Sequence, residues 1–164
     1  MNPHFPKFQK IILHPLKFGF FLLQKLPAAW MAGLHMKKFE VEEAVVSVRF
    51  KWLNQNPFKS MYFAVQSMAA EMSTGMLAFG QIYQRNPSVS MLVVGMEAKF
   101  HKKAVDIITF TCSEGVLIAD TIEKALSSGE GQTIHCYSVG KNIAGETVSE
   151  FWFTWSFKSK TSKH

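Results

Sequence analysis

The sequence predicts an α+β fold in which an antiparallel sheet of about five strands wraps around one long buried helix. The helix is predicted over residues 60–84, a segment of small and apolar residues that holds one charged side chain, Glu71, and no proline. A helix that is apolar on every side is a buried helix. The sheet is predicted from five strand-like segments, two of which, 40–53 and 90–104, alternate apolar and polar residues as half-buried antiparallel strands do.

Length and composition fit one globular domain. A chain of 164 residues with 48% hydrophobic residues is large enough to bury a core, and this composition excludes a disordered chain. The net charge of +6 favours anionic partners. However, the basic residues gather near the two ends, and no nucleic-acid-binding motif is present. We therefore expect no nucleic-acid partner.

The two cysteines, Cys112 and Cys136, lie in strand-like segments without a CxxC pair or the spacing of metal ligands. We expect buried free thiols, no metal site, and a reducing compartment, the cytoplasm. The apolar run over residues 18–23 is short for a signal peptide, and no small-x-small cleavage site follows it. We therefore expect this run to belong to the mature chain.

Residues 1–29 are predicted to form a helical extension, with one or two amphipathic helices over residues 4–26 that break near Pro15. Apolar residues recur there at helical spacing, with lysines between them. Two interpretations are open: a basic helix on a membrane surface, or a helix packed over the sheet or over a partner subunit. We favour the packed helix and expect no integral membrane insertion, because charges interrupt the apolar residues.

The main domain is predicted over residues 30–158, and its first strand is the segment 40–53. The apolar side chains expected on the inner face of that strand are Ala44, Val46, Val48, Phe50 and Trp52. A polar turn then leads into the long helix, for which Asn56 or Ser60 is the expected N-cap, with Pro57 in the first turn.

The second half of the domain is predicted to add more strands and a short helix. These elements are expected over residues 90–104, 105–112, 113–128 (the helix), 132–139 and 146–157. Gly95 is expected to mark a bulge, Ser113 to cap the short helix and Gly129 to end it. The last two strands form a hairpin, and the final one carries four aromatic residues on one face: Phe151, Phe153, Trp155 and Phe157. Residues 159–164 are expected to be a polar tail.

This order of elements resembles the hotdog fold of the thioesterase superfamily. Small acyl-CoA thioesterases of the phenylacetate-pathway type carry an Asn, a Gly three positions later, a His-Gly-Gly that starts six positions after the Asn, and an acidic residue nine positions after the His. Asn56 and Glu71 match the first and last of these residues, and Tyr62 stands in place of the His. The residues that replace the glycines are Lys59, Phe63 and Ala64.

Three short stretches are also similar to a poorly characterised bacterial branch of this superfamily. They are Asn-Pro-Phe-Lys-Ser-Met-Tyr, Ala-Glu-Met-Ser-Thr-Gly and Trp-Ser-Phe-Lys. The resemblance implies a homodimer, or a tetramer as the alternative, that hydrolyses an acyl-CoA or another acyl thioester between two subunits. No cofactor is required beyond the coenzyme A moiety of the substrate.

The candidate catalytic residues are Glu71, as the general base, and Asn56, which would hold a water molecule or the carbonyl group. The candidate substrate-binding residues are Tyr62, Ser73, Thr74 and Lys59. The residues expected to face the phosphates of coenzyme A are Arg85, Lys99, Lys102 and Lys103. Glu71 lies about four turns along the helix, so the resemblance implies that it meets the Asn56 region of a partner subunit.

Each candidate also has a structural alternative. Glu71 would instead form a structural ion pair with Arg49, Lys51 or Lys99, and Asn56 would simply cap the helix. Ser73 and Thr74 would form hydrogen bonds back to their own helix. The basic residues would form a solvated rim. At the level of function, the alternative is a non-catalytic hotdog dimer that binds a fatty acyl group or lipid. The lone Glu71 favours hydrolysis, and the replaced His-Gly-Gly favours binding.

Overall fold

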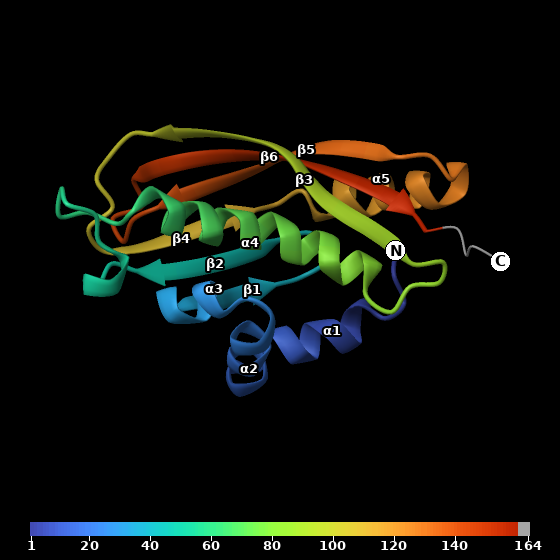
Figure 1. Cartoon of the computed structure of the whole chain (residues 1–164), viewed down its shortest axis with the longest axis horizontal. Helices are drawn as coiled ribbons and strands as arrows, with labels where there is room; N and C mark the ends of the chain where they lie inside the picture. Colours follow the sequence, from blue (N-terminus) through green and yellow to red (C-terminus); the bar gives the residue numbers. More distant parts are fainter. Residues whose placement is uncertain (161–164) are drawn as a thin grey trace.

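The computed structural model describes residues 1–160 and contains one antiparallel sheet of six strands (Figure 1). In spatial order the strands are β1 (Leu34–Phe39), β2 (Ala44–Arg49), β4 (Ile107–Cys112), β5 (Gln132–Lys141), β6 (Thr147–Ser159) and β3 (Val89–Phe100). The sheet curves around the long helix α4 (Phe63–Ile82), which contacts four of the strands: β2, β4, β5 and β6. This is the arrangement that the hotdog resemblance implies.

Helix α4 confirms the long buried helix, but its start differs from the prediction. The N-cap is Tyr62, which makes no side-chain capping bond. Asn56 is therefore not the N-cap. Its Oδ1 accepts hydrogen bonds from the backbone N–H groups of Phe58 (2.9 Å) and Ser60 (3.2 Å). These bonds close a separate polar turn before the helix, and Pro57 lies in that turn.

Strand β1 was not predicted from the sequence. Only its two end residues, Leu34 and Phe39, are buried, and a register shift between Met36 and Lys38 interrupts the pairing with β2. The strand predicted over 40–53 is correspondingly shorter, because the chain turns into a short 3₁₀ helix, η1 (Trp52–Asn54). Trp52 is therefore 81% exposed, and its predicted place on the inner face is wrong.

Strands β3 and β4 follow each other in sequence but are not neighbours in the sheet. Strand β4 lies between β2 and β5, whereas β3 crosses to the far edge and pairs only with β6. The bulge expected at Gly95 is confirmed by a register shift between Val93 and Gly95. As an edge strand, β3 exposes an apolar row that alternation alone would place in a core: Leu92, Val94, Met96 and Phe100.

The elements of the second half otherwise follow the prediction. Helix α5 (Gly115–Ser128) ends at Gly129, whose φ of 71° is the left-handed conformation that favours glycine. Its N-cap is Glu114, not Ser113, whose hydroxyl donates to Glu43 instead. The β5–β6 hairpin is confirmed, and all four aromatic residues on the inner face of β6 are buried. Both cysteines are buried free thiols.

Three helices form the N-terminal part of the chain: α1 (Phe5–Ile12), α2 (Pro15–Lys25) and α3 (Pro27–Ala32). The break near Pro15 is confirmed, and Pro27 starts a third helix rather than ending the helical part. The residues that pack α1 and α2 onto the core are Phe5, Phe8, Ile12, Phe18 and Leu22. The ring of Phe8 packs against four other aromatic rings, at distances of 4.9–6.3 Å between ring centroids: Tyr83, Phe79, Phe39 and Phe21. The packed-helix interpretation is therefore confirmed for the inward sides of α1 and α2.

At the C-terminus, β6 extends to Ser159, and residues 161–164 of the predicted tail lie outside the described residues. Within residues 1–160, none of the helices has both the length and the apolar character needed to cross a bilayer.

Candidate active site

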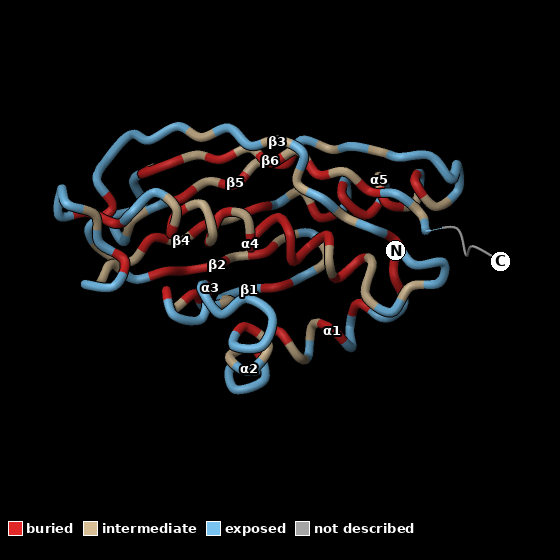
Figure 2. Tube along the Cα trace, in the orientation of Figure 1, coloured by how far each residue is buried: buried red, intermediate tan, exposed pale blue. Residues whose placement is uncertain are grey.

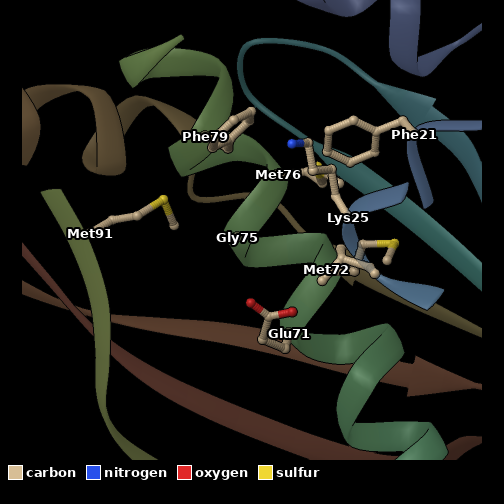
Figure 3. A pocket seen from close by; sticks show the side chains of 9 residues that line it. Phe21, Lys25, Glu71, Met72, Gly75, Met76, Phe79 and Met91 are labelled. Atoms are coloured by element: carbon tan, nitrogen blue, oxygen red, sulfur yellow. The ribbon is translucent and has the colours of Figure 1, made fainter. Parts of the chain in front are cut away.

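A cavity of about 290 Å³ lies beside the middle of α4, and its walls come from three elements (Figure 3). Five lining residues share one face of α4, since they form two rows with a spacing of four positions: Glu71, Gly75 and Phe79 in one row, Met72 and Met76 in the other. The opposite walls are Phe21, Lys25 and Leu26 from the end of α2, and Met91 from β3. Apart from Glu71 and the Lys25 side chain, the lining is apolar.

Glu71 is the only carboxylate of this cavity. It is half-buried, and within residues 1–160 its side chain has neither a hydrogen-bond partner nor an ion pair. In Figure 3, Lys25 lies with Phe21 and Phe79 at the end of the cavity away from the carboxylate. Loss of water raises the pKa of Glu71 from 4.5 to about 7.

The structural ion pair considered for Glu71 is wrong. Lys51 Nζ donates to the carbonyl of Met31 at 3.0 Å. The Lys99 ammonium stands 5.3 Å from the centre of the Trp152 ring. Neither side chain lines the cavity, and Arg49 lies at the end of β2, beside a different hollow of the surface. Glu71 therefore keeps a raised pKa because no cation offsets its burial.

Gly75 belongs to this site and was missed by the sequence analysis. A Cβ atom at Gly75 would lie 2.9 Å from Glu71 Oε1 and 3.0 Å from the Trp155 ring, closer than side-chain atoms normally approach. The absent side chain therefore makes room for the carboxylate. A signal was available, because glycine inside a helix costs about 1 kcal/mol relative to alanine and often marks a close approach. The walls from α2 have no comparable signal in the sequence.

Ser73 and Thr74 lie on the other side of α4 and do not line the cavity. The Ser73 hydroxyl donates to Ala70 O (2.7 Å) and lies 2.8 Å from the hydroxyl of Ser138 on β5. Thr74 Oγ1 accepts a hydrogen bond from Trp155 Nε1 (2.9 Å). A third polar pair of this kind joins Gln66 Oε1 to the Ser149 hydroxyl at 2.8 Å. In this subunit, then, Ser73 and Thr74 attach the helix to the sheet rather than contact a ligand.

Four of the remaining predicted site residues line a second cavity near the start of α4, of about 520 Å³. Asn56, Tyr62, Lys102 and Lys103 are among its lining residues, together with Phe100 from the end of β3. Lys59 lies in the same polar turn with a positive φ of 57°. Phe63 at the helix start and Glu71 are separated by eight residues, or about 12 Å of helix. Within one subunit, Asn56 and Glu71 therefore face different cavities.

The four basic residues expected at coenzyme A do not form one cluster. Arg85 lies beyond the other end of α4, where its guanidinium pairs with Glu123 at 2.5 Å. Lys102 pairs with Glu146, and Lys103 Nζ donates to the carbonyl of Phe58 at 3.4 Å. Only Lys102 and Lys103 line a cavity with another predicted site residue. Among residues 1–160, no three His, Cys, Asp or Glu side chains gather closely enough to hold a metal ion.

Comparison with solved structures finds this fold in proteins of low sequence identity. A protein of unknown function from Pseudomonas aeruginosa, called a probable thioesterase, is 18% identical with a TM-score of 0.74, over 92% of this chain and 99% of that one. A protein of unknown function from Chlorobaculum tepidum is 14% identical with a TM-score of 0.74, over 91% and 99%. A thioesterase from Haemophilus influenzae is 10% identical with a TM-score of 0.64, over 91% and 94%.

A comparison with curated protein sequences gives no match. The model of the family described as "Domain of unknown function (DUF4442)" matches residues 17–155, which is most of the chain. The chain therefore belongs to the DUF4442 family and has the hotdog fold.

Proposed function

We propose that this protein hydrolyses an acyl thioester, an acyl-CoA above all, with Glu71 as the general base. The observation that carries the proposal is the lone carboxylate in an apolar cavity, with its pKa raised to about 7. A general base works best when its pKa is near the operating pH, because it is then both ionised and basic enough to accept a proton. At neutral pH, Glu71 meets both conditions.

The cavity walls suit an acyl chain. The thioether side chains of Met72, Met76 and Met91 line it, and methionine adapts to ligands of differing shape because its side chain is flexible. A thioester carbonyl at the Glu71 end would place a water molecule between the carboxylate and the carbon to be attacked. Glu71 would take a proton from that water molecule while the water oxygen bonds to the carbonyl carbon. The bond from this carbon to sulfur would then break, and coenzyme A would leave as the thiolate.

We place the complete site in a homodimer formed through β3. This strand is an exposed edge with an apolar row, the kind of edge that pairs with another strand. Antiparallel pairing of two β3 strands sets the Phe100 end of one beside the Met91 end of the other. Phe100 lines the Asn56 cavity, and Met91 lines the Glu71 cavity. The partner's Asn56 region would thus approach Glu71.

The basic residues around the Asn56 cavity suit the phosphates of the leaving group. Lys102 and Lys103 line this cavity, the exposed Lys59 lies in the adjoining turn, and Tyr62 offers a hydroxyl and an aromatic surface in the same cavity. In the proposed dimer, coenzyme A would lie along this basic cavity while the acyl chain enters the apolar one.

The test is a panel of acyl-CoA substrates of increasing chain length, with release of the free thiol as the readout. Wild type should hydrolyse at least one substrate, and Glu71→Gln should lower the rate by roughly 10²–10⁴-fold, the usual contribution of a general base. Glu130→Gln is the matched control, since Glu130 is exposed in the connection between α5 and β5. This variant should keep the wild-type rate. An unchanged rate in a folded Glu71→Gln protein would remove the catalytic assignment.

The second candidate is a non-catalytic dimer that binds a fatty acyl group. It is favoured by the apolar cavity lining and by Tyr62-Phe63-Ala64 in place of His-Gly-Gly. Saturable binding of an acyl-CoA or fatty acid, without thiol release from any member of the panel, would select this candidate.

A further inference from the structure

The outward side of helix α2 is apolar although nothing in this subunit covers it. Leu16, Phe20 and Leu23 recur at helical spacing and are 81%, 61% and 46% exposed. The opposite side of the same helix is also apolar, with Phe18 and Leu22 buried against the core. Apolar side chains therefore occupy two opposite sides of α2, and only one of these sides is buried. Apolar surface left in water gains free energy when a partner covers it.

The apolar outward side of α2 lies at the surface of a projecting helix. Helix α2 projects from the body of the molecule (Figure 1), and most of its outer turns are exposed (Figure 2). Further exposed apolar residues lie just before and after it: Leu13, Leu26, Trp30 and Met31. We call Leu16, Phe20 and Leu23, together with these four residues, the α2 surface. Exposed apolar residues gathered on and around one helix in this number mark an interaction site.

The charge of the protein identifies the partner. Residues 1–39 hold six lysines and none of the 12 acidic residues, so the remaining 12 basic residues are balanced by 12 acidic ones. The whole net charge of +6 thus resides in the segment that contains the α2 surface. Of the six lysines, only Lys38 forms an ion pair within the described part of the chain. Lys7, Lys10, Lys17 and Lys25 are exposed on α1 and α2.

We infer that the α2 surface binds an anionic lipid bilayer. Exposed leucine and phenylalanine side chains beside unpaired lysines match an interface in which acyl chains lie just below negatively charged head groups. Binding of this kind is peripheral, because only the outward side chains of α2 enter the bilayer.

The position of the Glu71 cavity fits this inference. Helix α2 carries Leu16, Phe20 and Leu23 of the α2 surface on its outward side. The same helix and its C-cap also supply three residues of the cavity wall: Phe21, Lys25 and Leu26. A bilayer bound at the α2 surface would therefore lie next to the apolar cavity. An acyl chain would then pass between bilayer and cavity along one helix without crossing water. The bilayer binding itself does not depend on whether the protein is a hydrolase.

The experiment is co-sedimentation of the full-length protein with large vesicles. One set contains phosphatidylcholine only, and the other contains phosphatidylcholine mixed with phosphatidylglycerol. Wild type should pellet with the anionic vesicles and not with the neutral ones, and added salt should release it because salt screens exposed charges.

Two variants separate the apolar and the charged contributions. Leu16→Gln/Phe20→Gln/Leu23→Gln should weaken binding by about a hundredfold or more, from the lost burial of three large apolar side chains. Lys7→Gln/Lys10→Gln/Lys17→Gln should weaken it on the order of a hundredfold, since each lysine near an anionic surface contributes about fivefold. The matched control is Val116→Gln/Leu117→Gln/Ile143→Gln, which removes three exposed apolar residues elsewhere and should bind like wild type.

All substituted side chains are exposed, so each variant should keep the wild-type circular dichroism and melting temperature. The inference is overturned if wild type does not pellet with anionic vesicles. It is also overturned if the triple variant of the apolar residues, or the triple variant of the lysines, binds these vesicles as well as wild type. It is also overturned if the apolar variant shows a smaller assembly than wild type by light scattering, because the α2 surface would then be an interface between copies of this chain.

Discussion

The carboxylate of Glu71 lies over Gly75, one turn further along α4, at the only place on that turn where a side chain is absent. A Cβ atom there would come within 2.9 Å of Glu71 Oε1, and the ring of Trp155 would close the other side at 3.0 Å. The carboxylate can move away from an added methyl group, but the indole is packed in the core and 4% exposed. Space for Glu71 in its observed position therefore depends on glycine.

Gly75→Ala should consequently lower thiol release from the best acyl-CoA substrate by about 10²-fold, the cost of a misplacement of about 1 Å in a catalytic group. Alanine is the better helix former by about 1 kcal/mol, and overpacking against Trp155 costs about 1–3 kcal/mol, so the net loss of stability should stay below about 2 kcal/mol. Gly19→Ala in α2 is the control, because a Cβ atom there meets nothing within 4 Å. That variant should be slightly stabilised and fully active, and equal activities of the two alanine variants would contradict the steric role of Gly75.

The raised pKa of Glu71 predicts that the protein loses stability as pH rises. The pKa is about 7 in the folded protein and near 4.5 in the unfolded chain. Between these values the folded state holds more protons than the unfolded state, so the free energy of unfolding falls with increasing pH. The loss should amount to at most about 3 kcal/mol between about pH 4 and about pH 8.

Glu71→Gln removes this dependence, so the variant should match wild type near pH 4 and be the more stable protein near pH 8. Urea unfolding at the two pH values measures the difference, and Glu130→Gln should keep the wild-type slope. A variant destabilised by several kcal/mol at both pH values would instead mean that the carboxylate has a cationic partner in the assembled protein. In activity assays, the wild-type rate should rise through about pH 7 as Glu71 ionises.

The packing of the N-terminal helices should contribute strongly to stability. Phe8 is 1% exposed among four aromatic rings. Phe8→Ala should therefore lower the free energy of unfolding by about 3–5 kcal/mol, and deletion of residues 1–26 should lower it at least as much. Leu16→Ala, on the outward side of α2, should stay within about 0.5 kcal/mol of wild type. Chemical unfolding of the three variants tests this, and a mild Phe8→Ala would show that α1 is loosely attached.

The exposed edge strand β3 predicts that the protein is at least a dimer in solution, with a mass well above the 18.6 kDa of one chain. Val94→Lys places a charge on the exposed edge, and a charge there opposes strand pairing. Light scattering at micromolar concentration should show a dimer or tetramer for wild type and a smaller species for Val94→Lys. Ile143→Lys, in the exposed β5–β6 turn, should leave the assembly unchanged. A wild-type protein that is purely monomeric would contradict the dimeric site.

Helix α4 could be predicted from the sequence because its signal is local. A long segment with one charge and no proline has few structural options, and the same feature singled out Glu71. Strand β1 could not be predicted, because His35, Lys37 and Lys38 interrupt its apolar residues and a bulge breaks the alternation. In that strand the pairing with β2, a long-range interaction, outweighs the local pattern.

The cavity was equally beyond the reach of sequence patterns. Phe21, Lys25 and Leu26 lie more than forty positions before Glu71, and the packing of α1 and α3 against α4 brings them there. The placement of Asn56 failed for a different reason. An asparagine before a helix serves equally well as an N-cap or as the first residue of a closed turn, and the observed turn at 56–60 uses its side chain fully.

The polar pairs between α4 and the sheet have a consequence for the angular setting of the helix. Three hydrogen bonds, spread along the helix from Gln66 to Thr74, join it to β5 and β6. A slip of one residue would turn the helix by about 100° about its own axis and separate all three pairs at once. Apolar residues of similar shape could replace such pairs with little change in stability, but they would tolerate several rotations. The direction in which Glu71 points is therefore set by hydrogen bonds on the side of the helix that faces away from the cavity.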